Sequence, residues 1–184
     1  DVYKRQLHTW QVAADGTLSR IQGTSVGSLR GLALSDDGKQ VYFTTLYGGL
    51  EVRSRDTVTG AIGSSAIQTL DEGTLQSARA KLVYSAGDYV YVVLDPDSFV
   101  SQDTLTVLKR GSNDRLSVVD LGWANTTDGS FDGTTTHSLA ASADGQFIYL
   151  GDSEQGVIQV YQLGSNGLVR IDSIALDQVN GLTL

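Results

Sequence analysis

The sequence predicts an all-β protein, and both its composition and an internal repeat support this prediction. Among 184 residues, 21 are glycine and one is proline, while Val, Ile, Thr and Tyr recur in short clusters between the glycines. Clusters of β-branched and aromatic residues between turn-forming residues are typical of short strands. The repeat reads GLALSDDGKQVY at residues 31–42 and SLAASADGQFIY at residues 138–149.

Each copy of the repeat predicts a β-hairpin. An apolar strand leads to an Asp-Gly turn, where glycine tolerates a positive φ, and a second strand then ends in an aromatic residue. Residues 81–91 (KLVYSAGDYVY) form a third, weaker copy in which the turn residues are reversed to Gly87-Asp88. The first strands of the units are therefore expected near Leu32, Leu82, Leu139 and Leu182.

An alternating strand follows each hairpin, at residues 49–62, 104–111 and 156–163, so each unit contains four strands. The tyrosines that end the hairpins are 49 and 58 residues apart, and the longer interval contains an insertion at residues 122–136. Propeller blades repeat roughly every 40–50 residues. The spacing and the four strands together predict a β-propeller.

The order of these units divides the chain into consecutive blades. Residues 8–18 mirror residues 159–168, which makes the first unit a half blade and places Trp10 where Tyr161 stands. We therefore expect Trp10 to pack between blades. The expected boundaries are a half blade at 7–28, full blades at 29–76, 77–122 and 137–179, and the start of a further innermost strand at 180–184. Because a blade face without a neighbour is adhesive, we expect this piece to need further blades of the same chain to close the ring.

The charge and the residue types exclude several classes of function. A formal net charge of −8, without any basic cluster, argues against nucleic acid and anionic membranes as partners. No apolar run approaches the roughly 20 residues that cross a bilayer as a helix. The absence of cysteine excludes disulfides and thiolate chemistry, and no P-loop, G-x-G-x-x-G or H-E-x-x-H motif is present. We therefore expect no cofactor.

The residues at 32–42 (LALSDDGKQVY) and 52–62 (VRSRDTVTGAI) resemble the repeats of lactonase-type propellers, the 6-phosphogluconolactonase-like and YVTN-like proteins. The resemblance covers nearly the whole chain. It implies a propeller fold, found both in sugar-lactone hydrolases and in large bacterial surface proteins. The chain departs from the pattern at Asp36 and Ala143, which stand where the family usually has proline.

Polar residues precede the predicted innermost strands, where a propeller places the mouth of its central channel. Arg30, His137 and Asn180 stand two residues before an anchor leucine, and Arg79 and Lys81 flank that point in the weak copy. Such a ring could bind an anionic or sugar-like ligand, with His137 as a general base near its unperturbed pKa of about 6.5. The alternative is that these positions are polar because the rim is wet.

The loops between second and third strands add carboxylates to the same mouth. Asp152 and Glu154 lie in one such loop, and Asp95, Asp97 and Asp103 lie in another. Carboxylates facing the basic ring could hold a water or a hard cation. The alternative is that they are ordinary solvated loop acids.

The insertion at 122–136 is the most unusual segment, because it carries aromatic residues and two Asp-Gly pairs. Long loops on rigid scaffolds often bind ligands, which makes Trp123 a candidate contact residue. Asp128 and Asp132 suggest a calcium loop, but their spacing does not match the EF-hand pattern and no bidentate glutamate follows. No metal site is therefore predicted with them.

Two functions follow from these features. The first is a non-enzymatic propeller segment of a secreted or surface bacterial protein, which presents loops to a protein or carbohydrate partner. The second, implied by the resemblance, is a cytoplasmic sugar-lactone hydrolase in which His137 activates water and Arg30 holds the acidic substrate.

Overall fold

The fold is all-β. The computed structural model describes residues 6–176 except 48, 72, 76–78, 96–103, 121–135, 154 and 166. These described residues form fourteen strands in four antiparallel sheets and no helix. No part of the described chain forms a helix that is long and apolar enough to cross a membrane.

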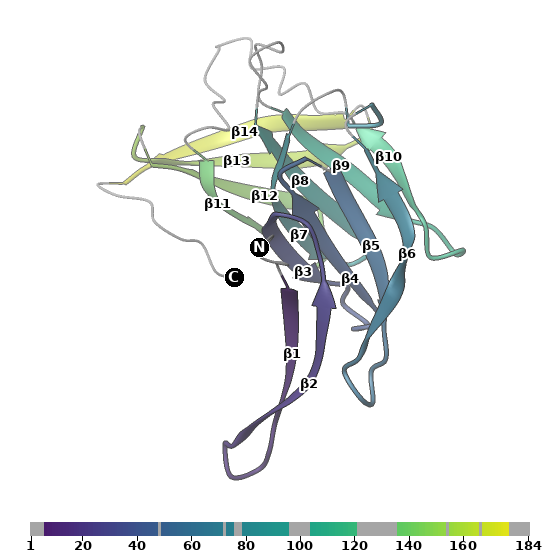
Figure 1. Cartoon of the computed structure of the whole chain (residues 1–184). Helices are drawn as coiled ribbons and strands as arrows, with labels where there is room; N and C mark the ends of the chain where they lie inside the picture. Colours follow the sequence, from purple (N-terminus) through teal and green to yellow (C-terminus); the bar gives the residue numbers. More distant parts are fainter. Residues whose placement is uncertain are drawn as a thin grey trace.

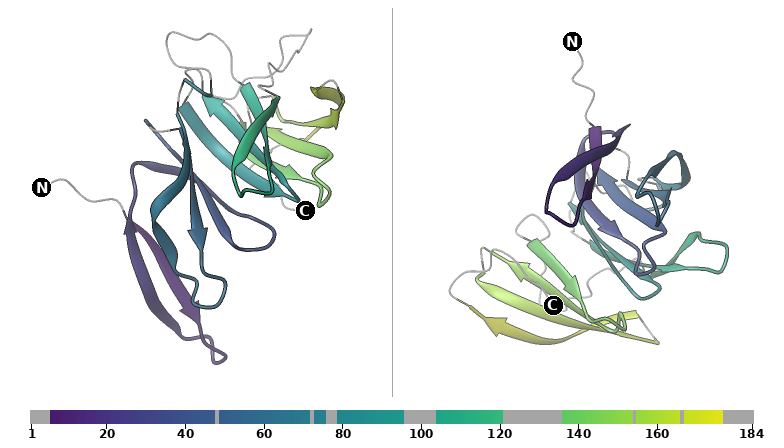
Figure 2. Two further views of the ribbon diagram at one scale, coloured as in Figure 1. Left: turned by 90° about the vertical axis from the view of Figure 1, so that its right-hand side faces the viewer. Right: turned by 90° about the horizontal axis from the view of Figure 1, so that it is seen from below.

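The strands pair in chain order within each sheet, as expected for blades made of consecutive hairpins. The first sheet has two strands and the other three have four each. Seen from below, the sheets follow one another along an arc (Figure 2). The strands are β1 (Gln6–Val12) and β2 (Leu18–Ser25); β3 (Leu29–Leu34), β4 (Gln40–Thr45), β5 (Gly49–Arg55) and β6 (Ile62–Leu70); β7 (Arg79–Ala86), β8 (Tyr89–Asp95), β9 (Thr104–Arg110) and β10 (Leu116–Asp120); β11 (Thr136–Ala141), β12 (Phe147–Asp152), β13 (Val157–Gly164) and β14 (Gly167–Ala175) (Figure 1).

The repeated motif forms the predicted hairpins, and its residues explain why. In the β3–β4 turn the Ser35 hydroxyl donates to the Asp37 carboxylate (2.7 Å) and accepts from the backbone N–H of Gln40 (2.9 Å). Gly38 takes a φ of +67°, which a residue with a Cβ rarely adopts. The β11–β12 turn repeats this arrangement, with Ser142 bonded to Asp144 and to the Phe147 amide.

The hydrophobic core lies between the sheets. One cluster joins Tyr42 and Val52 of the second sheet to Val83 and Val92 of the third. Another joins Tyr91 and Val107 of the third sheet to Ile148 and Tyr161 of the fourth, and these residues are buried. The second, third and fourth sheets therefore pack face-on in series.

Glutamines in the outermost strands fasten successive sheets together. The side-chain amide of Gln22 donates to the backbone carbonyl of Ile62 (2.9 Å) and accepts from the backbone N–H of the same residue (2.8 Å). One sheet further on, Gln68 forms the same two bonds with Leu116, at 2.9 and 2.8 Å. We call this two-bond contact the glutamine clasp. It satisfies the first backbone groups of the neighbouring outermost strand.

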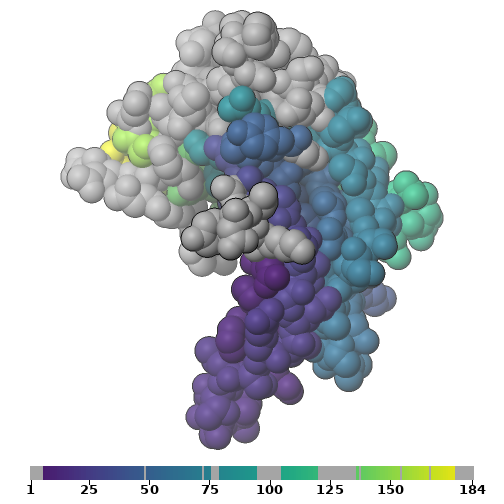
Figure 3. All heavy atoms as spheres, viewed as in Figure 1, coloured from purple at the N-terminus to yellow at the C-terminus, as the bar shows by residue number. Residues whose placement is uncertain are grey.

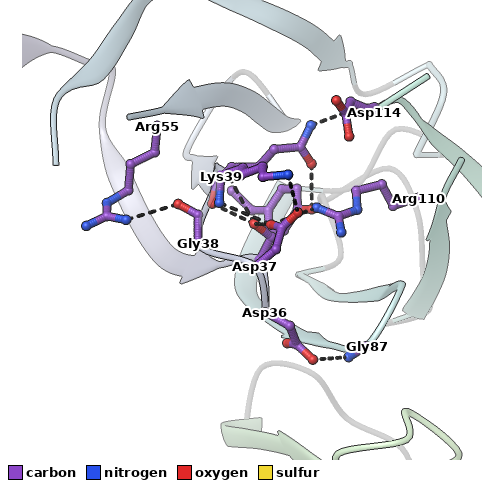
Figure 4. Close-up of polar contacts among 11 residues, drawn as sticks. Asp36, Asp37, Gly38, Lys39, Arg55, Gly87, Arg110 and Asp114 are labelled. Carbon is purple, nitrogen blue, oxygen red and sulfur yellow. Dashed lines mark hydrogen bonds and ion pairs between the residues drawn. The ribbon is translucent and has the colours of Figure 1, made fainter. Parts of the chain in front are cut away.

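A charged network fastens the second sheet to the third at the end that carries the hairpin turns (Figure 4). Arg110 donates to Asp37 across the two sheets (3.1 Å), and the Asp36 carboxylate accepts from the Gly87 amide (2.7 Å). The Arg110 guanidinium and the Ser35 hydroxyl hold the pKa of the Asp37 carboxyl well below its usual value of 3.8. The ion pair between Asp37 and Arg110 is therefore fully charged at neutral pH.

The expectation that Trp10 packs between blades is wrong for the described chain. Its side chain is 51% exposed, whereas the equivalent Tyr161 is buried. Tyr161 lies on the face of the fourth sheet that packs against the third. No described sheet lies against the corresponding face of the β1–β2 hairpin, which extends from the body of the molecule (Figure 3).

Candidate functional site

The three described innermost strands lie next to one another, since β3 contacts β7 and β7 contacts β11. Each starts opposite the end of the second strand of its own sheet: Leu29 pairs with Thr45, Arg79 with Asp95, and Thr136 with Asp152. The starts of the first strands and the ends of the second strands therefore share one end of the molecule. This is the end opposite the Ser-x-Asp-Gly turns.

Each described innermost strand has a β-bulge near its start, and the residue that the strand register skips is basic. Pairing skips Arg30 between Leu29 and Gly31, Lys81 between Ala80 and Leu82, and His137 between Thr136 and Ser138. A bulge inserts one extra residue and redirects the side chains around it. Counted from the bulges, Val83 is the equivalent of Leu32 and Leu139, so the expected anchor Leu82 is displaced by one residue. Lys81 is the true equivalent of Arg30 and His137.

A close approach of two strands brings Arg30 and Lys81 to the same place. The Thr44 hydroxyl donates to the Lys81 carbonyl (3.2 Å) across the boundary between sheets. A Cβ on Gly31 would lie 3.0 Å from that carbonyl oxygen and 2.9 Å from the Thr44 hydroxyl oxygen. A side chain at residue 31 would force these neighbours to shift, so glycine lets the backbone beside Arg30 lie close to the backbone of Lys81.

An aromatic side chain extends this basic surface. The Arg79 guanidinium lies 5.8 Å from the centre of the Tyr47 ring, within the range of a cation–π contact. Tyr47 lies in the β4–β5 connection and is 72% exposed. The sequence analysis did not identify Tyr47, although its place directly after the predicted second strand was a usable signal. We call Arg30, Tyr47, Arg79 and Lys81 the rim cluster.

The carboxylate candidate Asp152 has a different environment. It is the last residue of β12, is 2% exposed, and accepts a hydrogen bond from the Gln155 amide (3.0 Å). This bond supports the start of the β12–β13 connection, so Asp152 acts at least in part as a structural residue. Near it, the Ser138 hydroxyl is buried and has no hydrogen-bond partner among the described residues.

The other predicted site residues are not fully described. The backbone of His137 lies in β11. The side chains of His137 and Asp95 are not among the parts that the structure describes. Within the described ranges, no group of three His, Cys, Asp or Glu residues could hold a metal ion. Asp97, Asp103, Trp123, Asp128, Asp132, Glu154 and Asn180 lie outside the described residues.

Comparison with known proteins identifies the architecture. No protein-family model and no curated protein matches the chain. Among solved structures, a Lactobacillus plantarum protein matches with a TM-score of 0.68 over 94% of this chain and 52% of its own, at 17% identity. A Bacteroides fragilis protein provisionally named a 6-phosphogluconolactonase matches with a TM-score of 0.63 over 95% of this chain and 56% of its own, at 17% identity.

A third structure is the periplasmic gluconolactonase of Pseudomonas aeruginosa, with a TM-score of 0.57 and 17% identity over 91% of this chain. This chain covers 51% of that protein, so it spans about half the length of the structures it matches. At such identities the likeness shows the fold, whereas the function has to be argued from the site.

Proposed function

Because the chain has the lactonase-type β-propeller fold, we propose that its rim cluster binds a small anionic ligand of the sugar-acid class. The observation that carries this proposal is the repeated bulge, which places Arg30 and Lys81 at the same position of two adjacent innermost strands. The two cationic residues stand on adjoining backbone segments in a chain whose net charge is −8. Carboxylates and phosphates are the groups that such cations attract.

The rim cluster also contains features that suit a sugar ring. Tyr47 offers an exposed aromatic face beside Arg79, and aromatic rings commonly pack against apolar faces of ligands. The structural neighbours include proteins named for sugar lactones, which is why we choose a sugar acid over other anions.

The proposal predicts which variants weaken binding of 6-phosphogluconate to the purified chain. Arg30→Gln and Lys81→Gln each remove one charge-assisted hydrogen bond, which is worth about 1.5–3 kcal/mol, so we expect about tenfold or greater loss of affinity. Lys39→Gln removes a cation at the opposite end of the molecule and serves as the matched control. Isothermal titration calorimetry measures all three, and equal affinities across them contradict the proposal.

A second candidate function is hydrolysis of a sugar lactone, favoured by two neighbours that carry the name of a lactonase, one of them provisionally. In this mechanism the imidazole of His137 takes a proton from water as the water oxygen attacks the lactone carbonyl. The ring C–O bond then breaks, and the imidazolium returns the proton to the leaving alkoxide, which becomes a sugar hydroxyl, while Arg30 holds the acidic group. A lactonase assay on the complete gene product tests it. Loss of hydrolysis in His137→Ala supports the mechanism, and an inactive wild-type protein excludes it for the lactones assayed.

Non-enzymatic docking of a protein or carbohydrate at a bacterial surface is a further prediction from the sequence. The rim cluster provides no specific reason to choose it over a small ligand. Cell fractionation and a glycan array test the location and the partner separately.

A further inference from the structure

Among the described blades, one hydrogen bond at the rim forms at a single boundary between sheets. Thr44 is the residue before the last one of β4, and its hydroxyl donates to the Lys81 carbonyl of the third sheet. The strand pairings place Leu94 and Gly151 at the same position of β8 and β12. Neither of those side chains can donate a hydrogen bond. The contact therefore belongs to the boundary between the second and third sheets and is not a general feature of the repeat.

The glycine that makes room for this bond also stands at that boundary. Counted from the bulges, the equivalents of Gly31 in the next two sheets are Leu82 and Ser138. A Cβ on Gly31 would lie 3.0 Å from the Val83 nitrogen as well as from the Lys81 carbonyl oxygen. The donor hydroxyl and the missing side chain therefore occur together, where the bulges of β3 and β7 meet.

A second contact crosses the same boundary. The Arg79 guanidinium of the third sheet lies over the Tyr47 ring of the second sheet. Two residues after the ends of β8 and β12 the chain has Asp97 and Glu154, so of these three sheets only the second has an aromatic residue at this position. Both contacts join the segments that carry the cations of the rim cluster.

Thr44 acts on the rim through the backbone. Its side chain is fully buried, so a ligand at the surface does not touch it. The register of β7 shifts between Ala80 and Leu82, which places Lys81 outside the regular ladder. Backbone groups at a bulge need hydrogen-bond partners from elsewhere. The Thr44 hydroxyl is such a partner for the Lys81 carbonyl.

We propose that Thr44 is a positioning residue, whose hydroxyl holds the bulge of β7 against β3 and so sets the spacing of Arg30 and Lys81. The inference rests on the proposed function, in which these two residues bind the anionic ligand. Arg30 directly precedes the glycine that lies against this bond, and Lys81 provides the acceptor. A shift of either backbone segment therefore moves one cation relative to the other.

The first measurement is binding of 6-phosphogluconate to the full chain by isothermal titration calorimetry. Thr44→Val keeps the shape of the side chain but removes the donor, and we expect about two- to tenfold weaker binding, the range that one neutral hydrogen bond covers. Thr44→Ser keeps the donor and is expected to retain the wild-type affinity. Thr106→Val is the matched control, because Thr106 is also fully buried but its hydroxyl has no hydrogen-bond partner among the described residues. We expect this control to leave the affinity unchanged.

The second measurement reports the spacing itself and needs no ligand. The chain has no cysteine, so nitroxide labels on Arg30→Cys and Lys81→Cys are the only labels present. By electron paramagnetic resonance we expect weaker and more widely distributed coupling between the labels in a Thr44→Val background, and unchanged coupling with Thr44→Ser or Thr106→Val. The added methyl group of Gly31→Ala forces the two backbones apart, so we expect it to weaken the coupling in the same way.

The two measurements separate the positioning role from the proposed function. If the wild-type chain binds no 6-phosphogluconate, the proposed function fails, and the label coupling alone decides whether Thr44 holds the bulge. The positioning role is overturned if Thr44→Val leaves the coupling unchanged. It is also overturned if the coupling changes while the affinity of a chain that binds the ligand stays the same. Urea unfolding checks that each variant is folded, and Gly31→Ala decides the question if Thr44→Val is not.

Discussion

At the scale of single residues, the ion pair between Asp37 and Arg110 shows how one contact links two blades. The two side chains come from different sheets and lie 3.1 Å apart, and Lys39 approaches the same carboxylate at 4.0 Å. Lys39 is mostly exposed, whereas Arg110 is mostly covered. Coulombic attraction between exposed charges is weak in water, so the Arg110 contact is the one that matters for stability.

We expect Asp37→Asn to lower the free energy of unfolding by about 1 kcal/mol at pH 7, a value reduced by the partial exposure of the carboxylate. Because the pKa of Asp37 is lower in the folded than in the unfolded chain, this stabilisation is present above about pH 4. It is lost as the pH falls below 3.8 towards the pKa of the folded state. Urea unfolding at pH 7 and near pH 2 measures the difference.

Lys39→Ala is the matched control for this prediction. It removes the exposed partner of the same carboxylate, so we expect a change within about 0.5 kcal/mol. A gap between wild type and Asp37→Asn that persists unchanged in acid contradicts the assignment of the stabilisation to ionised Asp37.

At the scale of elements, the glutamine clasp joins two outermost strands, because one side-chain amide both donates and accepts a hydrogen bond. Gln22 and Gln68 each follow an isoleucine in the outermost strand of their sheets. The clasp needs a donor and an acceptor on one side chain, which a carboxylate does not provide. This requirement makes the contact testable with a nearly isosteric change.

We expect Gln68→Glu to lower the free energy of unfolding by about 1–3 kcal/mol at neutral pH, because the introduced carboxylate faces the Leu116 carbonyl without a proton to donate. This contact raises the pKa of the introduced carboxyl above its unfolded value. Part of the lost stability therefore returns as the pH falls through that raised pKa. Chemical denaturation between pH 7 and pH 4 measures it, with Gln11→Glu, an exposed β1 position, as the control.

The sequence predicted the hairpins well because their turns are local. Ser, Asp and Gly at fixed spacing close the turn with their own hydrogen bonds, so Gly38 and its equivalent mark the hairpins directly. The weak third copy was misplaced by one residue at Leu82, since nothing in the sequence shows where a bulge inserts an extra residue. The sequence analysis did not find the glutamine clasps for a related reason. The partner of Gln68, Leu116, is determined by how the sheets pack, which the sequence does not show.

The candidate site was predicted less completely. Arg30 and Lys81 were identified from their place ahead of apolar strands, but the equivalence of Lys81 and Arg30 emerged only from the strand pairing. The exposure of Trp10 could not be inferred from its similarity to Tyr161, because burial depends on the neighbouring sheet as well as on the residue.

At the scale of the whole molecule, the sheets differ in how many neighbours they have. The third sheet, β7–β10, packs against the second on one face and against the fourth on the other. Among the described residues, the β1–β2 hairpin packs against the second sheet alone, through contacts that include Leu7 and one glutamine clasp. Stability is therefore unevenly distributed along the chain.

This distribution predicts the order of amide hydrogen exchange. We expect the β8 and β9 amides to exchange most slowly and the β1 amides most rapidly, with the β4 amides in between. Exchange followed by mass spectrometry at neutral pH measures the order. Equal protection of β1 and β8 contradicts it, and Gln22→Ala should speed the exchange of β1 and β2 without affecting β8 and β9.

The Ser-x-Asp-Gly turns also have a consequence for the time course of folding. Each turn closes with bonds among residues at most five positions apart, so its hairpin can form before any contact between sheets. Isolated hairpins form in about 1–10 μs, whereas contacts distant in sequence form later. We therefore expect the hairpins to be the early units of folding and the docking of sheets to set the overall rate.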